Sequence, residues 1–211
     1  MTSASLSHDL AGTYDRLAAN YDKLHQRWLR HAGGEAQAAL EAIVRALVAT
    51  DTNLLDAGCG TGAFARSLIA EGMSPAHITL LDPSQAMLER CIDTNARQVN
   101  GRLETLPFES QTFDVVTCAW ALETAQDQEL ALRELCRVVR RRGVFCLVFC
   151  AEKPTRDLAE WLSRLAVTLR GTGQFLSCEL VINILRRSGE FEVRAVPTNG
   201  PAAALLARRL F

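Results

Sequence analysis

The segment Leu54–Gly62 joins a short apolar strand, a carboxylate and a glycine-rich turn, a pattern suited to binding a nucleoside cofactor. Glycine lets the backbone adopt dihedral angles that a Cβ forbids, so the chain can contact a ligand closely. The helix expected behind the turn directs free N–H groups and a positive dipole end at the same place. Asp56, just before the turn, attracts an amino group or a sulfonium and repels a pyrophosphate. We therefore expect Asp56, Gly58, Cys59 and Gly60 to hold a cationic nucleoside cofactor.

This nonapeptide, LLDAGCGTG, resembles the first motif of the class I S-adenosylmethionine-dependent methyltransferases, where an acid closes the first strand and a G-x-G-x-G turn follows. The resemblance implies S-adenosyl-L-methionine as the cofactor. The relaxed nicotinamide fingerprint G-x-G-x-x-A also fits, through Gly58, Gly60 and Ala63. The turn alone therefore leaves an NAD-dependent oxidoreductase open as an alternative.

Asp82 ends the next expected strand, within Leu80–Ser84, and can accept hydrogen bonds from both hydroxyls of a ribose. Its alternative role is to cap the following helix, which Ser84 can do as well. Pro83 and Met87 follow, and we expect Met87 either to face the adenine or to pack in the core. Asp82, Pro83 and Met87 are thus candidate cofactor-binding residues.

The segment Gly101–Phe108 resembles the G-D-A-x-x-L-P-F pattern that precedes strand four in the same family. Where the family commonly places an acid to bind the adenine amino group, this chain has Arg102, which cannot accept a hydrogen bond. Adenine recognition then depends on the Leu103 backbone N–H, on Glu104, or on a guanidinium stacked over the ring. We take Leu103 and Glu104 as candidate cofactor-binding residues.

The segment Thr117–Glu123 ends strand four, where the family lines the methyl-transfer site. It lacks the N-P-P-Y or D-P-P-Y motif of amino-methylating nucleic-acid enzymes, and no proline precedes Cys118 as a cytosine C5 nucleophile would require. Cys118 can offer its backbone to the methionine half of the cofactor, and Trp120 can line the acceptor pocket or fill the core. Glu123 stands where many small-molecule relatives have a histidine, so it is a candidate general base, or else a solvated residue near a helix start.

Ahead of the sheet, Tyr14-Asp15 and Ala18–Asp22 resemble the Y-D element of ubiquinone/menaquinone-biosynthesis and malonyl-carrier-protein methyltransferases. We expect Tyr21 to close over the sulfonium, with an ordinary aromatic on a helix face as the alternative. His25 lies one turn further along the same face. It is either a surface residue or, once a lid closes, the proton acceptor.

From Asn53 onward, strand-length apolar runs alternate with helical patterns, which predicts an α/β fold with parallel strands and crossover helices. The arginines before Gly143 predict the end of a helix, or alternatively a docking patch for an acidic partner such as a carrier protein. The expected strands are Asn53–Asp56, His77–Asp82, Gln98–Glu104, Phe113–Ala119 and Gly143–Cys150, and the expected helices are Gly62–Glu71, Ser84–Asn95 and Asp127–Arg140.

The remaining regions complete a single domain over residues 1–211, with its cofactor-binding core at 51–151. Residues 189–211 predict a hairpin whose last strand is antiparallel, whereas nicotinamide-binding domains normally complete an all-parallel sheet. We expect a Rossmann-like, doubly wound, seven-stranded sheet, mostly parallel with an antiparallel C-terminal hairpin. The flanking regions are a helical lid at 1–50 (helices near Asp9–Leu24 and Glu35–Ala49), a helical cap at 152–188 broken at Gly171-Thr172-Gly173, and hairpin strands Glu190–Pro197 and Ala202–Phe211.

Composition excludes several partners and locations. Lys and Arg number 23 against 24 Asp and Glu, so no basic field concentrates this chain on nucleic acid. The chain shows no secretory signal, and no apolar run approaches the ~18 residues that cross a bilayer, so we expect a cytoplasmic protein without a membrane span. Seven cysteines without a C-x-x-C pair or zinc-like spacing predict neither a metal site nor a disulfide. The oligomeric state is not predicted.

Together these features predict transfer of a methyl group from S-adenosylmethionine to an O or N atom of a small or carrier-bound molecule by in-line displacement. Positioning supplies ~7–11 kcal/mol of such a barrier. An amine can attack with its own lone pair, whereas a hydroxyl needs a base such as His25 or Glu123. A nicotinamide oxidoreductase is one alternative. A non-catalytic S-adenosylmethionine-binding sensor or assembly subunit is another, because Arg102 and the strand-four site depart from the family pattern.

Overall fold

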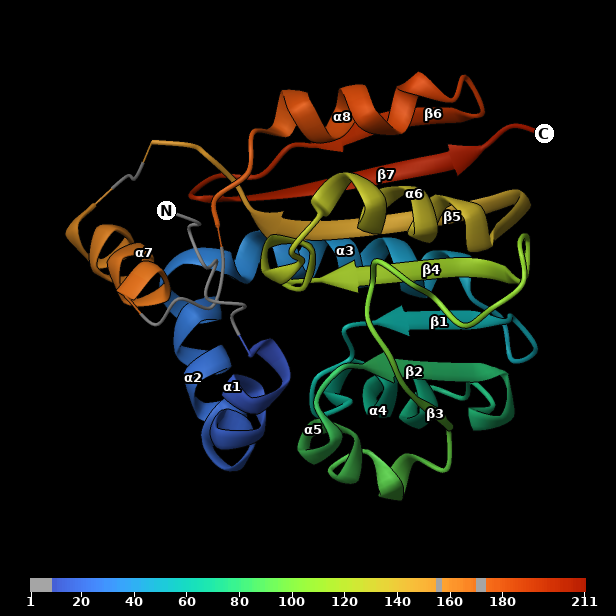
Figure 1. The fold of residues 1–211 in the computed structure, drawn as a ribbon, viewed down its shortest axis with the longest axis horizontal. Coiled ribbons are helices and arrows are strands. Elements are labelled where there is room, and N and C mark those ends of the chain that lie inside the picture. The colour runs from blue at the N-terminus through green and yellow to red at the C-terminus, as the bar shows by residue number, and fades with distance from the viewer. Residues whose placement is uncertain (1–8, 155–156, 170–173) are drawn as a thin grey trace, which may run out of the picture.

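A seven-stranded β-sheet with helices on both faces organises the chain (Figure 1). The computed structural model describes residues 9–154, 157–169 and 174–211, so the expected break at Gly171-Thr172-Gly173 lies outside the described residues. The strand order is β3-β2-β1-β4-β5-β7-β6. The strands are β1 Leu54–Ala57, β2 Ile78–Asp82, β3 Arg97–Asn100, β4 Phe113–Ala119, β5 Val139–Cys150, β6 Phe191–Val196 and β7 Ala202–Arg209.

The pairings β3-β2, β2-β1, β1-β4 and β4-β5 are all parallel, whereas β7 runs antiparallel to both of its neighbours, β5 and β6. This arrangement confirms the expected mostly parallel sheet with a reversed C-terminal hairpin. The all-parallel sheet that the nicotinamide alternative requires does not form. β3 is shorter than predicted and ends at Asn100, which leaves Gly101–Glu104 as a loop at the carboxyl edge of the sheet.

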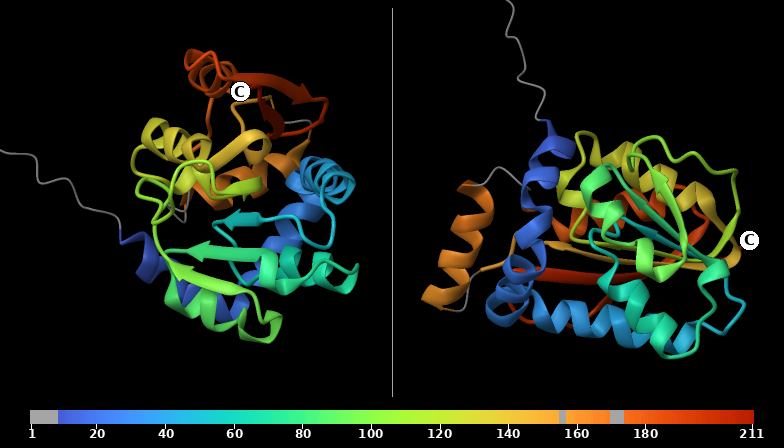
Figure 2. Two further views of the ribbon diagram at one scale, coloured as in Figure 1. Left: turned by 90° about the vertical axis from the view of Figure 1, so that its right-hand side faces the viewer. Right: turned by 90° about the horizontal axis from the view of Figure 1, so that it is seen from below.

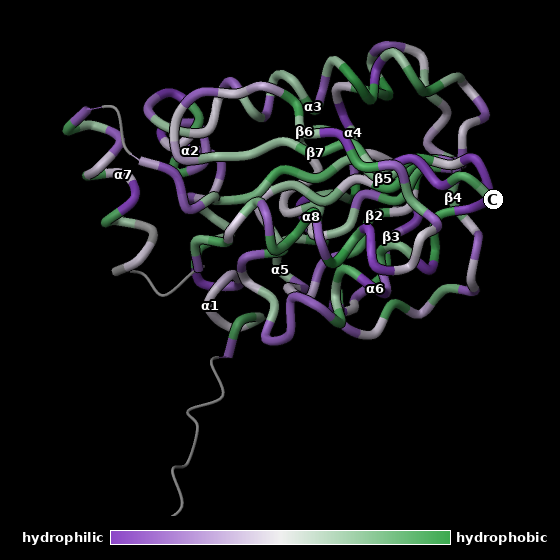
Figure 3. Tube along the Cα trace, turned by 90° about the horizontal axis from the view of Figure 1, so that it is seen from above, coloured by the Kyte–Doolittle hydropathy of each residue, from purple (hydrophilic) through white to green (hydrophobic). Residues whose placement is uncertain are grey.

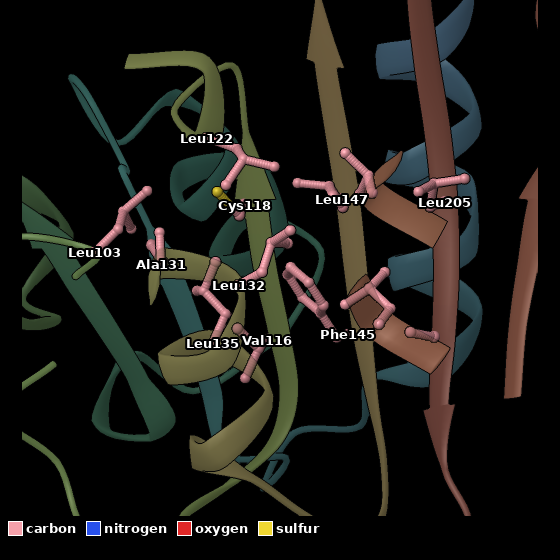
Figure 4. Packing of buried hydrophobic residues seen from close by; sticks show 14 of the residues in the cluster. Leu103, Val116, Cys118, Leu122, Ala131, Leu132, Leu135, Phe145, Leu147 and Leu205 are labelled. Atoms are coloured by element: carbon pink, nitrogen blue, oxygen red, sulfur yellow. The ribbon is translucent and has the colours of Figure 1, made fainter. Parts of the chain in front are cut away.

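The two faces of the sheet carry separate cores. Neighbouring strand residues point to opposite faces, so Leu54 joins the cluster of α3 and α4 while Leu55 joins that of α6 and α8. Figure 4 shows the second cluster, where Leu132 and Leu135 of α6 point toward Phe145 of β5. Hydrophobic segments gather in the central strands (Figure 3). The helices named here are α3 Gly34–Leu47, α4 Ala63–Ala70, α6 Gln128–Val138 and α8 Cys178–Arg187.

The predicted helix before the arginine run ends two residues earlier than expected, and the strand that follows begins four residues earlier. α6 ends at Val138 and β5 begins with the next residue, so residues 140–142 lie on an exposed stretch of strand. Pairing with β4 starts there, and Arg140 forms an ion pair with Asp114 of β4 at 2.5 Å. Residues 140–142 therefore belong to β5, in the register shift between its paired residues Val139 and Val144.

Helices α1 and α2 lie beyond the carboxyl ends of the parallel strands (Figures 1 and 2), whereas α3 packs on a face of the sheet. Gly33 does not interrupt them, contrary to the expected gap between two helices. A Cβ at Gly33 would lie 2.4 Å from the Trp28 indole nitrogen and 2.6 Å from the Trp120 ring, so this glycine makes room for two indoles. In order, the elements are α1 Leu10–Leu17, a 3-10 turn Ala18–Asn20, α2 Tyr21–Trp28, a π-helical turn Leu29–Gly33 and α3.

The predicted cap divides into two parts. α7, Leu158–Leu169, lies beside the lid helices, whereas α8 packs on the sheet through Val181 and Leu185. α7 therefore packs against the lid helices, whereas α8 belongs to the core of the sheet. In the described residues, no helix combines the length and the apolar character that crossing a membrane requires. The remaining short elements are α5 Gln85–Glu89 and the 3-10 turns Pro75–His77, Ile92–Thr94 and Leu122–Thr124.

Candidate functional site

The glycine turn after β1 has a backbone that only glycine adopts easily. Gly58, Gly60 and Gly62 have φ angles of +78°, +53° and +76°. A Cβ on Gly58 would also lie 2.3 Å from the Ala121 Cβ, so no side chain fits there. The Gly58 N–H donates to the Leu81 carbonyl of β2 at 2.7 Å, which fixes the turn against the neighbouring strand.

Asp82 ties the glycine turn to the end of β2. Its carboxylate accepts the Gly60 N–H on one oxygen and the Ser84 N–H on the other, both at 2.9 Å. Ser84 itself caps α5 by accepting from Met87, so Asp82 is not the cap. Burial raises the pKa of Asp82 to about 6, against the lowering effect of these two N–H groups. Each oxygen keeps a lone pair for a further donor.

Asp56 is the second buried carboxylate, at the end of β1. The Thr117 hydroxyl donates to it at 2.8 Å. Burial raises the pKa of Asp56 to about 6, opposed by that hydroxyl and reinforced by the charge of Asp82. Near neutral pH, two carboxylates therefore place negative charge beside the glycine turn, as a cationic ligand requires.

Two cavities flank the turn, and both are lined by Tyr21, Gly58, Gly60 and Trp120. The first encloses about 40 Å³ and the second about 240 Å³. The first cavity is also lined by Asp82, Pro83, Met87, Arg102, Leu103 and Glu104. The second cavity is also lined by His25, Gln37, Glu41, Asp56, Cys59 and Ala119.

Aromatic rings separate the two cavities. The Tyr21 ring lies over the turn, with Cε1 3.4 Å from where a Gly60 Cβ would be. His25 stacks on Tyr21 at 5.6 Å between centroids, and Trp120 meets His25 edge-on at 6.4 Å. Burial lowers the pKa of His25, while the charges of Asp22 and Glu41 raise it. Burial thus favours the neutral imidazole, the form that can accept a proton.

Two acids join the N-terminal helices to the glycine turn and to the start of α5. The sequence analysis did not select them as site residues. Asp22 accepts a 2.6 Å hydrogen bond from the Thr61 hydroxyl of the glycine turn. Asp15 accepts the Ser84 hydroxyl at 2.5 Å and the Ala86 N–H at 3.2 Å, at the start of α5. The signal was present in the sequence, since both acids follow the tyrosines of the Y-D element.

Trp120 has the most unusual backbone of the site. Its φ of +58° is rare for a bulky residue and is held where β4 ends. The indole N–H donates to the Gln37 side chain of α3 at 2.6 Å, and its ring meets Trp28 edge-on at 5.6 Å. The strained backbone therefore directs the ring into the wall shared by both cavities.

Glu123 is buried rather than solvated. It is 4% exposed, and its Oε1 accepts the Cys150 N–H at 3.2 Å. Its Oε2 is buried and has no hydrogen-bond partner in the described residues. Burial raises the pKa of Glu123 to about 7, although hydrogen bonds to Cys150 and to its own backbone oppose this. A carboxyl group titrating near neutral pH is suited to proton transfer.

The structure brings most predicted site residues together, and two lie apart. Cys118 is fully buried in the sheet core and lines neither cavity (Figure 4). Glu123 likewise lines neither cavity, but its charge raises the pKa of Tyr14 and of Tyr21 after the larger effect of burial, so it lies close behind the lid. Met87 is buried, as core packing requires, and it also lines the first cavity.

The residues present fit S-adenosylmethionine. The turn has no room for a Cβ at Gly58, and the Asp82 carboxylate has lone pairs to spare for donors such as ribose hydroxyls. Pro83, Met87 and Leu103 give the first cavity apolar surfaces suited to a purine. Asp56 and Glu41 in the second cavity supply negative charge for the ammonium and sulfonium groups.

Comparison with known proteins finds methyltransferases. Residues 55–147 match the family model described as a methyltransferase domain. The malonyl-[acyl-carrier protein] O-methyltransferase of Pectobacterium atrosepticum is 31% identical over 169 residues, covering 79% of this chain and 62% of that protein. The ubiquinone/menaquinone biosynthesis C-methyltransferase of Idiomarina loihiensis is 31% identical over 154 residues, covering 64% of this chain and 56% of that protein. The chain thus spans less than two thirds of the length of these relatives.

A solved structure from Thermotoga maritima, described as an S-adenosylmethionine-dependent methyltransferase and possible histamine N-methyltransferase, shares the fold. Its TM-score is 0.71 at 18% identity, covering 94% of this chain and 99% of that one. Residues 55–147 of this chain thus match a methyltransferase domain, and the chain has the fold of the S-adenosylmethionine-dependent methyltransferases, whose cofactor the residues of the site fit. Within that class, it is similar to the quinone-biosynthesis and malonyl-carrier methyltransferases.

Proposed function

We propose that this protein methylates an O or N atom of a small or carrier-bound acceptor by in-line displacement. The observation that carries the proposal is Glu123, a buried carboxyl group with one oxygen free of partners and a pKa raised to about 7. Such a group can take a proton from a hydroxyl or an ammonium at neutral pH, and it costs stability unless a ligand uses it. Bound S-adenosylmethionine supplies an activated methyl group on its sulfonium.

The protein's own residues then have distinct roles. Asp82 and the glycine turn hold the nucleoside, and Asp56 balances positive charge. Tyr21 and Trp120 exclude water from the space between the cavities, which strengthens electrostatic interactions there. Glu123 receives the acceptor's proton, with neutral His25 as the second candidate base. Glu123 is buried and lines neither cavity, so this role requires α1 and α2 to move aside when the acceptor binds.

The similarity to an O-methyltransferase of a carrier-bound malonyl group supports an oxygen acceptor. The similarity to a C-methyltransferase makes transfer to carbon the competing outcome. The test is incubation of the protein with methyl-labelled S-adenosylmethionine and a cell extract, followed by identification of the labelled product. A methyl group on O or N supports the proposal, and one on carbon contradicts it. Tight S-adenosylhomocysteine binding without any labelled product would favour the sensor alternative.

Once an acceptor is identified, Glu123→Gln tests the base. We expect kcat to fall about 100-fold at pH 8 with little change in the Kd for S-adenosylhomocysteine. Wild-type kcat is expected to rise with pH through about 7, where Glu123 loses its proton, and the variant loses that rise. Glu109→Gln, at an exposed glutamate, is the control. An unchanged pH profile in Glu123→Gln would assign proton removal to another group, His25 first.

A further inference from the structure

Arg102 and Glu104 present a donor and an acceptor side by side on the wall of the first cavity. Their Nη2 and Oε1 atoms are 3.5 Å apart, and both residues line the cavity with Pro83, Met87 and Leu103. The Glu104 side chain is 12% exposed and that of Arg102 is 39% exposed, so the acid lies deeper and the guanidinium nearer the mouth.

Glu104 is fixed in place but keeps hydrogen-bonding capacity. Its Oε1 accepts the Gln126 N–H at 2.8 Å, which anchors the carboxylate to the loop after β4. Within the described residues, the hydrogen bonds of this carboxylate all fall on Oε1, so Oε2 remains available to a ligand. Arg102 is oriented by the same carboxylate and has further N–H groups to donate.

Adenine offers the matching pattern. Its exocyclic amino group is a donor, and the ring nitrogens N1 and N7 on either side of that group are acceptors. A single acid can read only the amino group. An arginine beside an acid can read the amino group and a ring nitrogen together, so it distinguishes adenine from a base with a carbonyl at the same position.

We propose that Arg102 and Glu104 form a paired reader of the adenine base. Glu104 Oε2 accepts a hydrogen bond from the amino group, and Arg102 donates to a ring nitrogen beside it. Glu104 thus accepts the hydrogen bond that an acid at position 102 would accept in the family pattern. The donor at Arg102 adds specificity for adenine. This inference concerns the cofactor and does not depend on which atom the protein methylates.

Binding of cofactor analogues by calorimetry tests the pair. The ligands are S-adenosylhomocysteine, its 1-deaza and 7-deaza analogues, and S-inosylhomocysteine, in which a carbonyl replaces the amino group. We expect wild type to bind S-inosylhomocysteine at least tenfold more weakly than S-adenosylhomocysteine. This loss of affinity corresponds to roughly one charged hydrogen bond. For wild type, we expect one of the two deaza analogues to bind about tenfold more weakly than S-adenosylhomocysteine. For Arg102→Ala, the same analogue should bind almost as well as S-adenosylhomocysteine. Which analogue does so identifies the nitrogen that Arg102 contacts.

Controls separate recognition from folding. Arg141→Ala removes an exposed arginine near the start of β5, at the end of the strand away from the site. Arg102→Gln keeps the bulk of the side chain and replaces Arg102→Ala if that variant folds poorly. Glu104→Gln is expected to narrow the preference for the adenosyl over the inosyl ligand, because an amide can rotate to donate.

The proposal is overturned if both deaza penalties persist in the Arg102 variants, which would assign the ring nitrogens to backbone N–H groups such as that of Leu103. Equal wild-type binding of the inosyl and adenosyl ligands would also overturn it. Because these readouts need no methyl acceptor, failure here leaves the proposed transfer reaction untested and intact, and failure of that reaction leaves the adenine reader intact.

Discussion

The cofactor half and the acceptor half of the site are built differently. In the cofactor half, Asp56 and Asp82 are buried carboxylates whose partners are close in the fold, namely a Thr117 hydroxyl and two N–H groups. In the acceptor half, Glu123 has an oxygen without a partner and Trp120 has a φ of +58°. Burial disfavours the ionised carboxylates of both halves, but within the described residues the second half adds an unpartnered buried oxygen and a bulky residue with a left-handed backbone, both of which cost energy.

This difference indicates that the acceptor half tolerates substitution more easily than the cofactor half. The glycine turn and the two aspartates are constrained by backbone geometry, so any substitution there affects the cofactor. The acceptor half is made by side chains from α2, the loop after β4 and the end of β5, which meet only in the folded protein. Substitutions in the cofactor half should therefore weaken cofactor binding, whereas substitution of Glu123 in the acceptor half should change stability and leave cofactor binding intact.

The largest expected effect is that of Gly58→Ala. The new Cβ would lie 2.3 Å from that of Ala121, at a φ of +78°, so the turn must move. We expect S-adenosylhomocysteine affinity to fall more than about 100-fold, because backbone contact with the ligand is lost. Gly189→Ala is the matched control, with a φ of +69° and nothing within 4 Å of its Cβ. Similar binding losses in both variants would mean that backbone strain, and not close packing, explains the effect.

Glu123→Gln should affect stability in a pH-dependent way. The folded-state pKa of about 7 exceeds the usual 4.5, so the ionised form is disfavoured by folding. Wild type therefore loses stability relative to the variant as pH rises from 4.5 to 7, by roughly 3 kcal/mol in total. Urea unfolding of both proteins at pH 5 and pH 8 measures this difference. A constant difference across that range would show that Glu123 ionises as easily as in an unfolded chain.

Asp56→Asn should weaken the cofactor half without unfolding it. Asp56 loses its negative charge below a pH of about 6, so wild-type affinity for S-adenosylmethionine is expected to fall as pH drops through that value. The asparagine variant should bind about tenfold more weakly at pH 7.5, equivalent to ~1.4 kcal/mol. Its remaining pH dependence should come from Asp82, whose pKa is also about 6. Calorimetry from pH 5 to pH 8 checks both points, and a pH-independent wild-type Kd would contradict them.

The smallest expected effect is that of Asp22→Asn. It weakens the 2.6 Å hydrogen bond from Thr61 that holds α2 to the glycine turn. We expect the Kd for S-adenosylhomocysteine to change about threefold, the size of one partly exposed hydrogen bond, with unchanged unfolding. Asp51→Asn, an exposed acid in the turn before β1, is the control. An effect as large as that of Asp56→Asn would mean that Asp22 contacts the ligand directly.

The cofactor half could be predicted from sequence because its signals are local. A strand, a turn and a helix start within nine residues specify Asp56 and Gly58, and the strand-end position specifies Asp82. The lid acids Asp15 and Asp22 were missed because their partners are 69 and 39 residues away.

The errors have the same origin. The arginines at 140–142 carry a helix-stop pattern, but they belong to β5, in the register shift of its pairing with β4. The gap expected between Leu24 and Glu35 does not form, and nothing nearby in sequence indicates that Gly33 makes room for the indole rings of Trp28 and Trp120. Glu123 was recognised as a candidate base from its position, but its burial and free oxygen depend on β5 and could not be inferred.

The position of β7 has a consequence for biosynthesis. β7 follows β6 in the chain, yet it lies between β5 and β6. While the ribosome has made only the first six strands, β5 has an unpaired apolar edge and β6 has no neighbour at all. The nascent protein therefore exposes a strand edge open to aggregation until residues 202–209 emerge and insert. Slow translation just before that segment would prolong the exposure, and chaperone binding would be concentrated in that interval.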